Sequence, residues 1–201
     1  HVMRETALDP LTQFRSVNTE GTRAMALQAA ASGVRRLVYV SSIKVLGEHT
    51  EPARPFSAES HADPQDAYGQ SKWEAEQALH QVAHETGMEV VVVRPPLVYG
   101  AGAAGNFRQL VRLVSSGLPL PLGAIENRRS LIAIDNLVSL LRLCMQHPAA
   151  PGQTFLASDG IAPSTPQLVR TLAMAMGRRT PLWSVPEGWL MAAGRLTGRR
   201  A

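Results

Sequence analysis

The stretch Met88-Glu-Val-Val-Val-Val-Arg94 is an almost unbroken run of valine. Such a run is typical of a strand that is buried on both faces of a parallel sheet. A second apolar run, residues 34–40, ends in Ser41-Ser42 and predicts another strand. Residues 68–86 between them are rich in Ala, Glu and Gln, and they predict a helix that Gly87 closes. This strand, helix, strand order predicts an α/β fold.

The rest of the chain extends the same alternation. Before the first strand, residues 11–32 predict a helix that stops at Gly33. Residues 47–66 contain Pro, Ser and Asp without periodicity and predict a loop. After Pro95-Pro96 we expect strands at 130–134 and 154–157, and helices at 106–116, 135–146, 166–176 and 186–201.

Composition narrows the class of protein. The 201 residues are 45% hydrophobic and 18% charged, which suits a globular fold with a sizeable core. The net charge is only +4, and no basic stretch alternates with aromatic residues, so we expect no nucleic-acid partner. Cys144 is the only cysteine, which rules out an intrachain disulfide and predicts a core residue.

Because there is no secretory signal or membrane-spanning run, we expect a cytoplasmic protein that does not enter a membrane. The six His residues lack metal-ligand spacing, so no metal site is predicted.

The segment Tyr68-Gly-Gln-Ser-Lys72 is the strongest indication of chemistry. A Tyr and a Lys four residues apart lie on one face of a helix, so an ammonium can sit beside a phenol. A nearby cation favours the phenolate and lowers the phenol pKa from about 10. Such a phenol can remove and return the proton of an alcohol while a cofactor exchanges hydride. Ser42 can hydrogen-bond the same oxygen.

The alternative is a solvated Lys beside a half-buried Tyr, which is common on exposed helices. The context favours the functional interpretation. Ser42 and the Pro95-Pro96 segment each follow a predicted strand, and ligands bind outside the carboxyl ends of strands in a parallel sheet.

Several motifs in order carry a resemblance to a known family. They are Asn18-Thr-Glu-Gly21-Thr22, Val40-Ser41-Ser42, Tyr68-Gly-Gln-Ser-Lys72, Arg94-Pro95 with Val98-Tyr99-Gly100, Asn106-Phe107, and Arg129-Ser130 with Asp135-Asn136-Leu137. In this combination the chain resembles the extended short-chain dehydrogenase/reductases, in particular their nucleotide-sugar epimerase/dehydratase group. The resemblance implies a Rossmann-like parallel sheet with a smaller substrate-binding region. It covers most of the chain.

The resemblance also implies roles for single residues. Ser42, Tyr68 and Lys72 would be catalytic. The cofactor, NAD with NADP left open, would contact Asn18, Ser41, Tyr68, Lys72, Pro95 and Pro96. A nucleotide-sugar substrate would contact Ser42, Asn106 and Arg129, and a planar guanidinium suits a diphosphate. The alternatives are a helix-surface residue for Asn18 and a surface charge beside Arg128 for Arg129. Asp135 is expected to cap a helix instead of binding ligand.

Three departures from the family pattern refine this picture. Ile43-Lys44 stands where the related 4,6-dehydratases carry an Asp-Glu pair, which argues against dehydration. Leu97 stands where many epimerases carry a substrate-binding Asn. The family's glycine-rich turn and its adenosine-reading residue are not found in the 201 residues, and we expect them before His1. We therefore expect residues 1–97 to form part of a dinucleotide-binding domain, and residues 98–201 to be mainly substrate-binding, with 129–158 returning to the first.

The expected activity is NAD(P)-dependent epimerisation at C4 of a nucleotide-activated sugar, in particular a UDP-sugar, through a 4-keto intermediate. Two alternatives stay open: an NAD(P)H-dependent 4-ketoreductase, and a nucleotide-binding Rossmann module without turnover. The resemblance implies a homodimer formed through a helix bundle that includes the Tyr68 helix. We expect the 201 residues in isolation to be inactive, because backbone amides of the glycine-rich turn receive the pyrophosphate.

Overall fold

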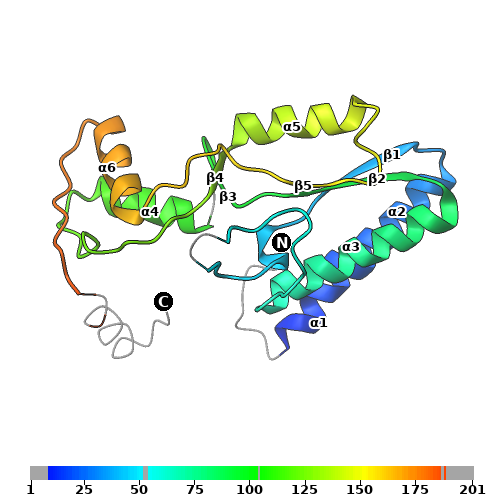
Figure 1. Cartoon of the computed structure of the whole chain (residues 1–201), viewed down its shortest axis with the longest axis horizontal. Helices are drawn as coiled ribbons and strands as arrows, with labels where there is room; N and C mark the ends of the chain where they lie inside the picture. Colours follow the sequence, from blue (N-terminus) through cyan, green and yellow to red (C-terminus); the bar gives the residue numbers. More distant parts are fainter. Residues whose placement is uncertain (1–8, 52–53, 104, 187, 189–201) are drawn as a thin grey trace. The chain divides into compact units, whose positions relative to one another are not determined.

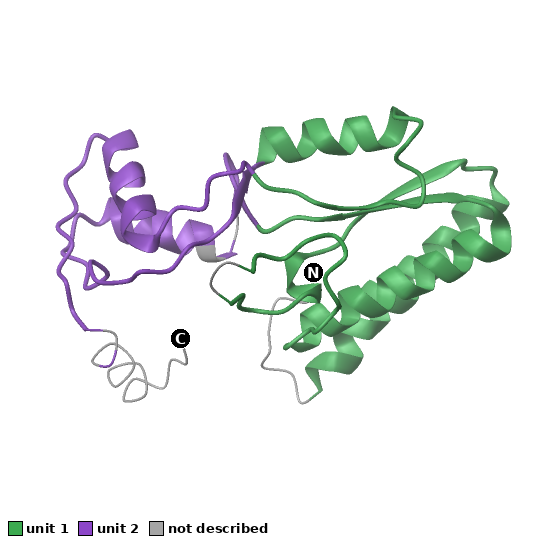
Figure 2. Cartoon of the chain, viewed as in Figure 1, with its two compact units in different colours: residues 1–96, 134–158 green, residues 97–133, 159–201 purple. Residues whose placement is uncertain are grey.

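The computed structural model of the chain describes residues 9–51, 54–103, 105–186 and 188. The chain divides into two compact units, shown in Figure 2. Unit 1 comprises His1–Pro96 and Ile134–Ser158, and unit 2 comprises Leu97–Ala133 and Asp159–Ala201. The parallel α/β architecture confirms the predicted fold class.

The centre of unit 1 is a parallel three-stranded sheet in the order β1 (Arg36–Val40), β2 (Glu89–Arg94), β5 (Thr154–Leu156). Val38 of β1 pairs with Val91 of β2, and Val93 of β2 pairs with Phe155 of β5. The valines of β2 are at most 3% exposed, because a strand lies on either edge and helices cover the faces. The valine run thus forms the predicted doubly buried strand.

Helices cover both faces of this sheet. In Figure 1, α2 (Gly21–Ala31) and α3 (Ala67–Thr86) lie on one side and α5 (Ile134–Gln146) lies on the other. The main core lies between the sheet and the α2–α3 layer, and its buried members are Ala26, Tyr39, Ala75, Leu79, Val82, Met88, Val90 and Val92. Gly87 ends α3 with a φ of +75°, as the sequence predicts.

The helix predicted over residues 11–32 is interrupted by a wider turn. It starts as α1 (Pro10–Phe14), continues as a π-helix, η1 (Arg15–Glu20), and ends as α2. Two η1 side chains bond to Ser71 of α3: Asn18 Nδ2 donates to Ser71 Oγ at 3.0 Å, and Thr19 Oγ1 donates to the Ser71 carbonyl at 3.0 Å. The π-turn therefore lies where this helix meets α3, and π-turns are frequent at functional sites.

Unit 2 contains the parallel strands β3 (Leu97–Tyr99) and β4 (Leu131–Ala133). The sequence did not predict β3, which is only three residues long. Helices α4 (Gly105–Ser115) and α6 (Thr165–Ala175) enclose a second small core, made of Val114, Leu120, Val169 and Ala173. Most of the predicted helix at 186–201 falls outside the described residues.

In the part of the chain that the structure describes, no helix combines the length and apolar character needed to cross a membrane. The same residues include no group of three or more His, Cys, Asp or Glu side chains arranged to hold a metal ion.

Candidate functional site

The site residues of unit 1 gather where β1 and β2 end. Ser41 and Ser42 follow β1, and Pro95 and Pro96 follow β2. Backbone bonds continue the pairing beyond the strands: the Ser41 amide donates to the Val93 carbonyl at 2.7 Å, and the Ile43 amide donates to the Pro95 carbonyl at 3.0 Å. The two post-strand segments are therefore side by side at the carboxyl edge of the sheet, the usual place for a ligand.

A short 3-10 turn, η2 (Ile43–Val45), carries Ser42 at its N-terminus. Ser42 Oγ accepts a hydrogen bond from the Lys44 amide at 3.3 Å. This turn packs tightly on the start of α3: a Cβ added to Gly69 would lie 2.7 Å from the Lys44 carbonyl oxygen. The glycine after Tyr68 is therefore needed for this close approach.

Tyr68 lies in the first turn of α3, and its ring packs edge-on against Phe14 with centroids 5.7 Å apart. Burial raises the pKa of the Tyr68 phenol, and the negative charge of Asp66 adds to the rise. A hydrogen bond with Ser42 and the positive charge of Lys44 act in the opposite direction. The structure thus brings the Ser42 hydroxyl within hydrogen-bond reach of the Tyr68 phenol, and their catalytic role stays a prediction.

The predicted lowering of the Tyr68 pKa is wrong for this structure, since burial raises that pKa. Lys72 Nζ donates to the Val40 carbonyl at 2.8 Å and lies 4.3 Å from the centroid of the Tyr39 ring. Burial lowers the pKa of Lys72 to about 8, and the charge of Glu76 partly offsets this. The i, i+4 spacing sets the helix face, but the acceptor at the end of β1 decides where the ammonium points.

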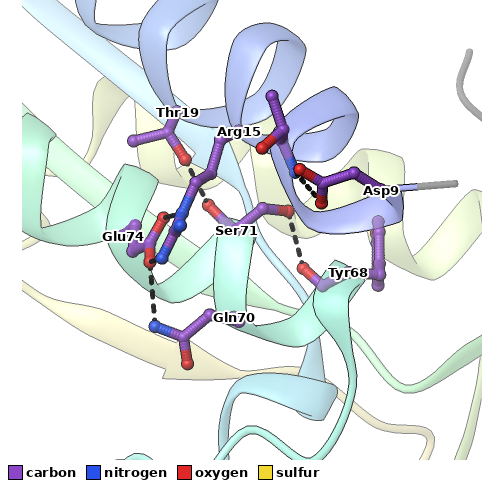
Figure 3. A network of polar contacts seen from close by, with 8 residues as sticks. Asp9, Arg15, Thr19, Tyr68, Gln70, Ser71 and Glu74 are labelled. Atoms are coloured by element: carbon purple, nitrogen blue, oxygen red, sulfur yellow. Dashed lines mark hydrogen bonds and ion pairs between the residues drawn. The ribbon is translucent and has the colours of Figure 1, made fainter.

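Asn18 lies at the contact of η1 with α3, where its amide bonds to Ser71 (3.0 Å). Ser71 Oγ in turn donates to the Tyr68 carbonyl at 2.8 Å, so Asn18 is linked to the first turn of α3. Figure 3 shows this turn with the neighbouring Arg15–Glu74 ion pair, in which Arg15 Nη2 and Glu74 Oε1 are 2.6 Å apart. Asn18 is therefore anchored beside the Tyr68 turn and is not an isolated surface residue.

Ser41 differs from its neighbour Ser42. Its side chain is buried, and its hydroxyl donates to the Glu76 carboxylate. Glu76 also binds Arg94, with Nη2 to Oε2 at 2.6 Å and Nε to Oε1 at 3.1 Å. Any contact of Ser41 with a cofactor therefore falls to its backbone, because the hydroxyl is used inside the protein.

Sequence reasoning missed four residues that shape this site. They are Lys44, Asp66, Glu76 and Arg94. Two of them had a signal in the sequence: Arg94 ends the valine run, and Glu76 lies four residues after Lys72. Charged side chains at buried positions need partners of opposite charge. Asp66 stands before the predicted helix in the position of an N-cap, and its side chain accepts from the Gly69 amide at 2.6 Å.

The two predicted substrate residues belong to unit 2. Asn106 is in the first turn of α4, and its side chain falls outside the description. Arg129 is exposed, and its amide donates to the Pro163 carbonyl at 3.1 Å. Their contact with a nucleotide-sugar substrate stays a prediction.

Comparison with known proteins identifies the family. Residues 3–157 match the family model described as "NAD dependent epimerase/dehydratase family". The chain is 50% identical over 187 residues to a UDP-glucose 4-epimerase of Vibrio cholerae, covering 92% of the chain and 56% of that protein. It is 25% identical over 202 residues to the N-acetyl-alpha-D-glucosaminyl-diphospho-ditrans,octacis-undecaprenol 4-epimerase of Escherichia coli O157:H7, covering 96% of the chain and 60% of that protein.

Solved structures share the fold. The Bordetella bronchiseptica enzyme WbmG in complex with NAD has a TM-score of 0.73 at 21% identity, covering 91% of the chain and 56% of that structure. The UDP-glucose 4-epimerase of Thermotoga maritima with UDP-glucose has a TM-score of 0.72 at 21% identity, covering 89% and 60%. The chain spans about half the length of the curated relatives it matches. By the family match and by its half-identical relative, the chain belongs to the NAD dependent epimerase/dehydratase family.

Proposed function

We propose that the intact protein uses NAD to epimerise a nucleotide-activated sugar, in particular a UDP-sugar, at C4 through a 4-keto intermediate. The observation that carries the proposal is the pairing of Ser42 with Tyr68 at the carboxyl edge of β1 and β2. Family membership and the half-identical UDP-glucose 4-epimerase support the substrate class. Lys44 binds two carboxylates where a dehydratase needs acidic groups, which disfavours dehydration.

The residues of unit 1 fit a nicotinamide cofactor. Lys72 presents an ammonium at the end of β1, where its further N–H groups suit the hydroxyls of a ribose. Pro95 and Pro96 border the same edge of the sheet, and Asn18 is held one turn from Tyr68. When bound, NAD accepts and returns hydride, which is the redox chemistry that inversion of an alcohol carbon requires. NADP remains an alternative cofactor. We also propose that the cofactor contacts the backbone of Ser41.

Proton handling falls to Tyr68 and Ser42. Tyr68 Oη removes the proton from the C4 hydroxyl of the sugar and returns a proton to the same oxygen after the ring has turned. Ser42 Oγ hydrogen-bonds that oxygen and keeps it within reach of the phenol. Burial and the charge of Asp66 raise the pKa of Tyr68. A cation near the phenol is therefore needed for the phenolate to form near neutral pH.

Two residues of unit 2 complete the proposal. We assign Asn106 and Arg129 to the diphosphate of the substrate, because a guanidinium can bind phosphate oxygens in a bidentate manner. Residues 1–97 would then form the cofactor side and residues 98–201 mainly the substrate side, with residues 129–158 returning to the cofactor side. We propose a cytoplasmic protein, and from the family resemblance we propose a homodimer formed through a helix bundle that includes α3.

The experiment is an assay of the intact protein with UDP-glucose and UDP-galactose, followed by NMR of the sugar. We expect interconversion, tightly retained NAD, and a loss of about 100-fold or more in kcat for Tyr68→Phe and for Ser42→Ala. Gln146→Ala, exposed at the end of α5, is the control and keeps full activity. Stoichiometric NADPH consumption would instead identify a 4-ketoreductase, and folded protein that binds nucleotide without turnover would identify a binding module.

A further inference from the structure

Lys44 and Asp66 join the two segments that carry Ser42 and Tyr68. Lys44 Nζ lies 2.5 Å from Asp66 Oδ2 and 2.7 Å from Glu48 Oε1. The other oxygen of Asp66, Oδ1, accepts from the Gly69 amide at 2.6 Å and thereby caps α3. One carboxylate therefore holds the η2 turn with one oxygen and the start of the Tyr68 helix with the other.

The same two segments are also tied through the backbone. The Lys44 amide donates to Ser42 Oγ at 3.3 Å, so the hydroxyl proton of Ser42 is left to donate elsewhere. The Lys44 carbonyl packs against Gly69 with no room for a Cβ. A displacement of η2 would consequently move Ser42 away from the Tyr68 phenol.

We propose that Lys44 and Asp66 are positioning residues of the epimerase site, acting as an ion-pair clamp that sets both the distance from Ser42 to Tyr68 and the electrostatic surroundings of the phenol. The catalytic part of this inference rests on the proposed function, whereas the clamp itself is a property of the described fold. Lys44 supplies a cation that acts on the Tyr68 phenol in this arrangement.

Two charged neighbours of Tyr68 act on its pKa in opposite directions, so removing each charge should shift that pKa in opposite directions. Among the described residues, the titratable groups that act on Tyr68 are Asp66 from the helix cap, Lys44 from η2 and the phenol of Tyr39 from β1, while α1 presents the Phe14 ring. Lys44 favours the phenolate and Asp66 opposes it. Asp66→Asn retains an oxygen that can cap α3 but loses the charge, and Lys44→Met retains the stem but loses the cation.

The experiment is a titration of the tyrosine ring carbons by NMR in the intact protein, with the Tyr68 signal assigned by its loss in Tyr68→Phe. Lys44→Met should raise the Tyr68 pKa and Asp66→Asn should lower it, each by about half a unit or more. Arg15→Met, which breaks a comparable ion pair to Glu74 of the same helix, should leave it unchanged.

Activity supplies the second readout. Lys44→Met should lower kcat about 10-fold and shift the alkaline limb of the pH profile of kcat, with KM nearly unchanged. Lys44→Arg should restore kcat and the pH profile. If Lys44→Met changes neither the Tyr68 pKa nor kcat in folded protein, the clamp is overturned. If the titration behaves as expected but the wild-type protein has no epimerase activity, the proposed function fails and the clamp stands.

Discussion

Glu76 and Arg94 form a bidentate ion pair inside unit 1, with side chains 0% and 6% exposed. Two parallel N–H to O bonds, at 2.6 and 3.1 Å, satisfy the guanidinium face, and the Ser41 hydroxyl adds a further donor to the carboxylate. Glu76 comes from α3, Arg94 from the end of β2, and Ser41 from the end of β1. The pair therefore joins the Tyr68 helix to both strands that border the candidate site.

Removing one partner of this pair should be strongly destabilising. Glu76→Gln leaves the Arg94 charge buried without a counter-charge, and we expect a loss of about 3–5 kcal/mol in the free energy of unfolding. The measurement is urea denaturation followed by circular dichroism. Glu74→Gln, which breaks the more exposed pair with Arg15, is the matched control and should cost less than about 1 kcal/mol. Equal losses of unfolding free energy in the two variants would contradict the special role of the buried Glu76–Arg94 pair.

Gly69→Ala should destabilise the protein although alanine is the better helix former. In an open helix interior this change gains roughly 1 kcal/mol, but here the new Cβ would meet the Lys44 carbonyl at 2.7 Å. We expect a lower melting temperature, because η2 must move away from α3. Gly21→Ala in α2 is the control, since its nearest neighbour is the Ser16 carbonyl at 3.5 Å. It should be neutral or stabilising. A stabilised Gly69→Ala would show that η2 can withdraw at no cost.

Lys72 should titrate near pH 8, well below the usual lysine range, because of its burial. The unfolded chain then binds more protons than the folded chain above pH 8, so the contribution of Lys72 makes the free energy of unfolding rise with pH. Unfolding measured from pH 8 to 9.5 stays below the ordinary tyrosine range, and Lys72→Met should flatten the slope. Glu76→Gln should lower the Lys72 pKa further, as seen by NMR of [13C]-methylated lysine, because Glu76 holds it up. A Lys72 signal that titrates above pH 10 would contradict this.

In unit 2, one oxygen of Asp159 accepts two hydrogen bonds. Tyr99 Oη donates to Asp159 Oδ2 at 2.8 Å, and the Ala133 amide donates to the same oxygen at 3.0 Å. Tyr99 and Ala133 stand opposite each other where β3 and β4 end, so Asp159 closes this strand pair. Asp159→Ala should cost about 1–3 kcal/mol of stability, because it leaves an amide and a hydroxyl without their acceptor.

The matched variant for this position is Asp159→Asn, which keeps an oxygen that can accept both bonds. Thermal unfolding should place it close to the wild-type protein. If Asn were as destabilising as Ala, the charge of Asp159 would matter more than its two hydrogen bonds.

The local sequence was sufficient for most elements of the fold. Consecutive valines have no polar face, so they predict a strand covered on both sides, and β2 is such a strand. Gly33 and Gly87 end helices because they adopt positive φ without steric cost. The short strand β3 and the π-turn η1 escaped prediction. Three residues carry little periodicity, and the widened turn of η1 coincides with contacts to Ser71 of α3, 52 and 53 residues away.

For the candidate site, too, the sequence predicts one part and the tertiary structure decides the rest. The pattern of Ser42, Tyr68 and Lys72 indicates the chemistry, and the alternation of strands and helices places Ser42 and Tyr68 at one sheet edge. Only the tertiary structure decides that Lys72 donates to the Val40 carbonyl, that the Ser41 hydroxyl bonds to Glu76, and that the Lys44 charge acts on Tyr68. Spacing along a helix determines which face a side chain leaves from. The direction of a long charged side chain, and the pKa of its neighbours, depend on acceptors and burial that distant segments supply.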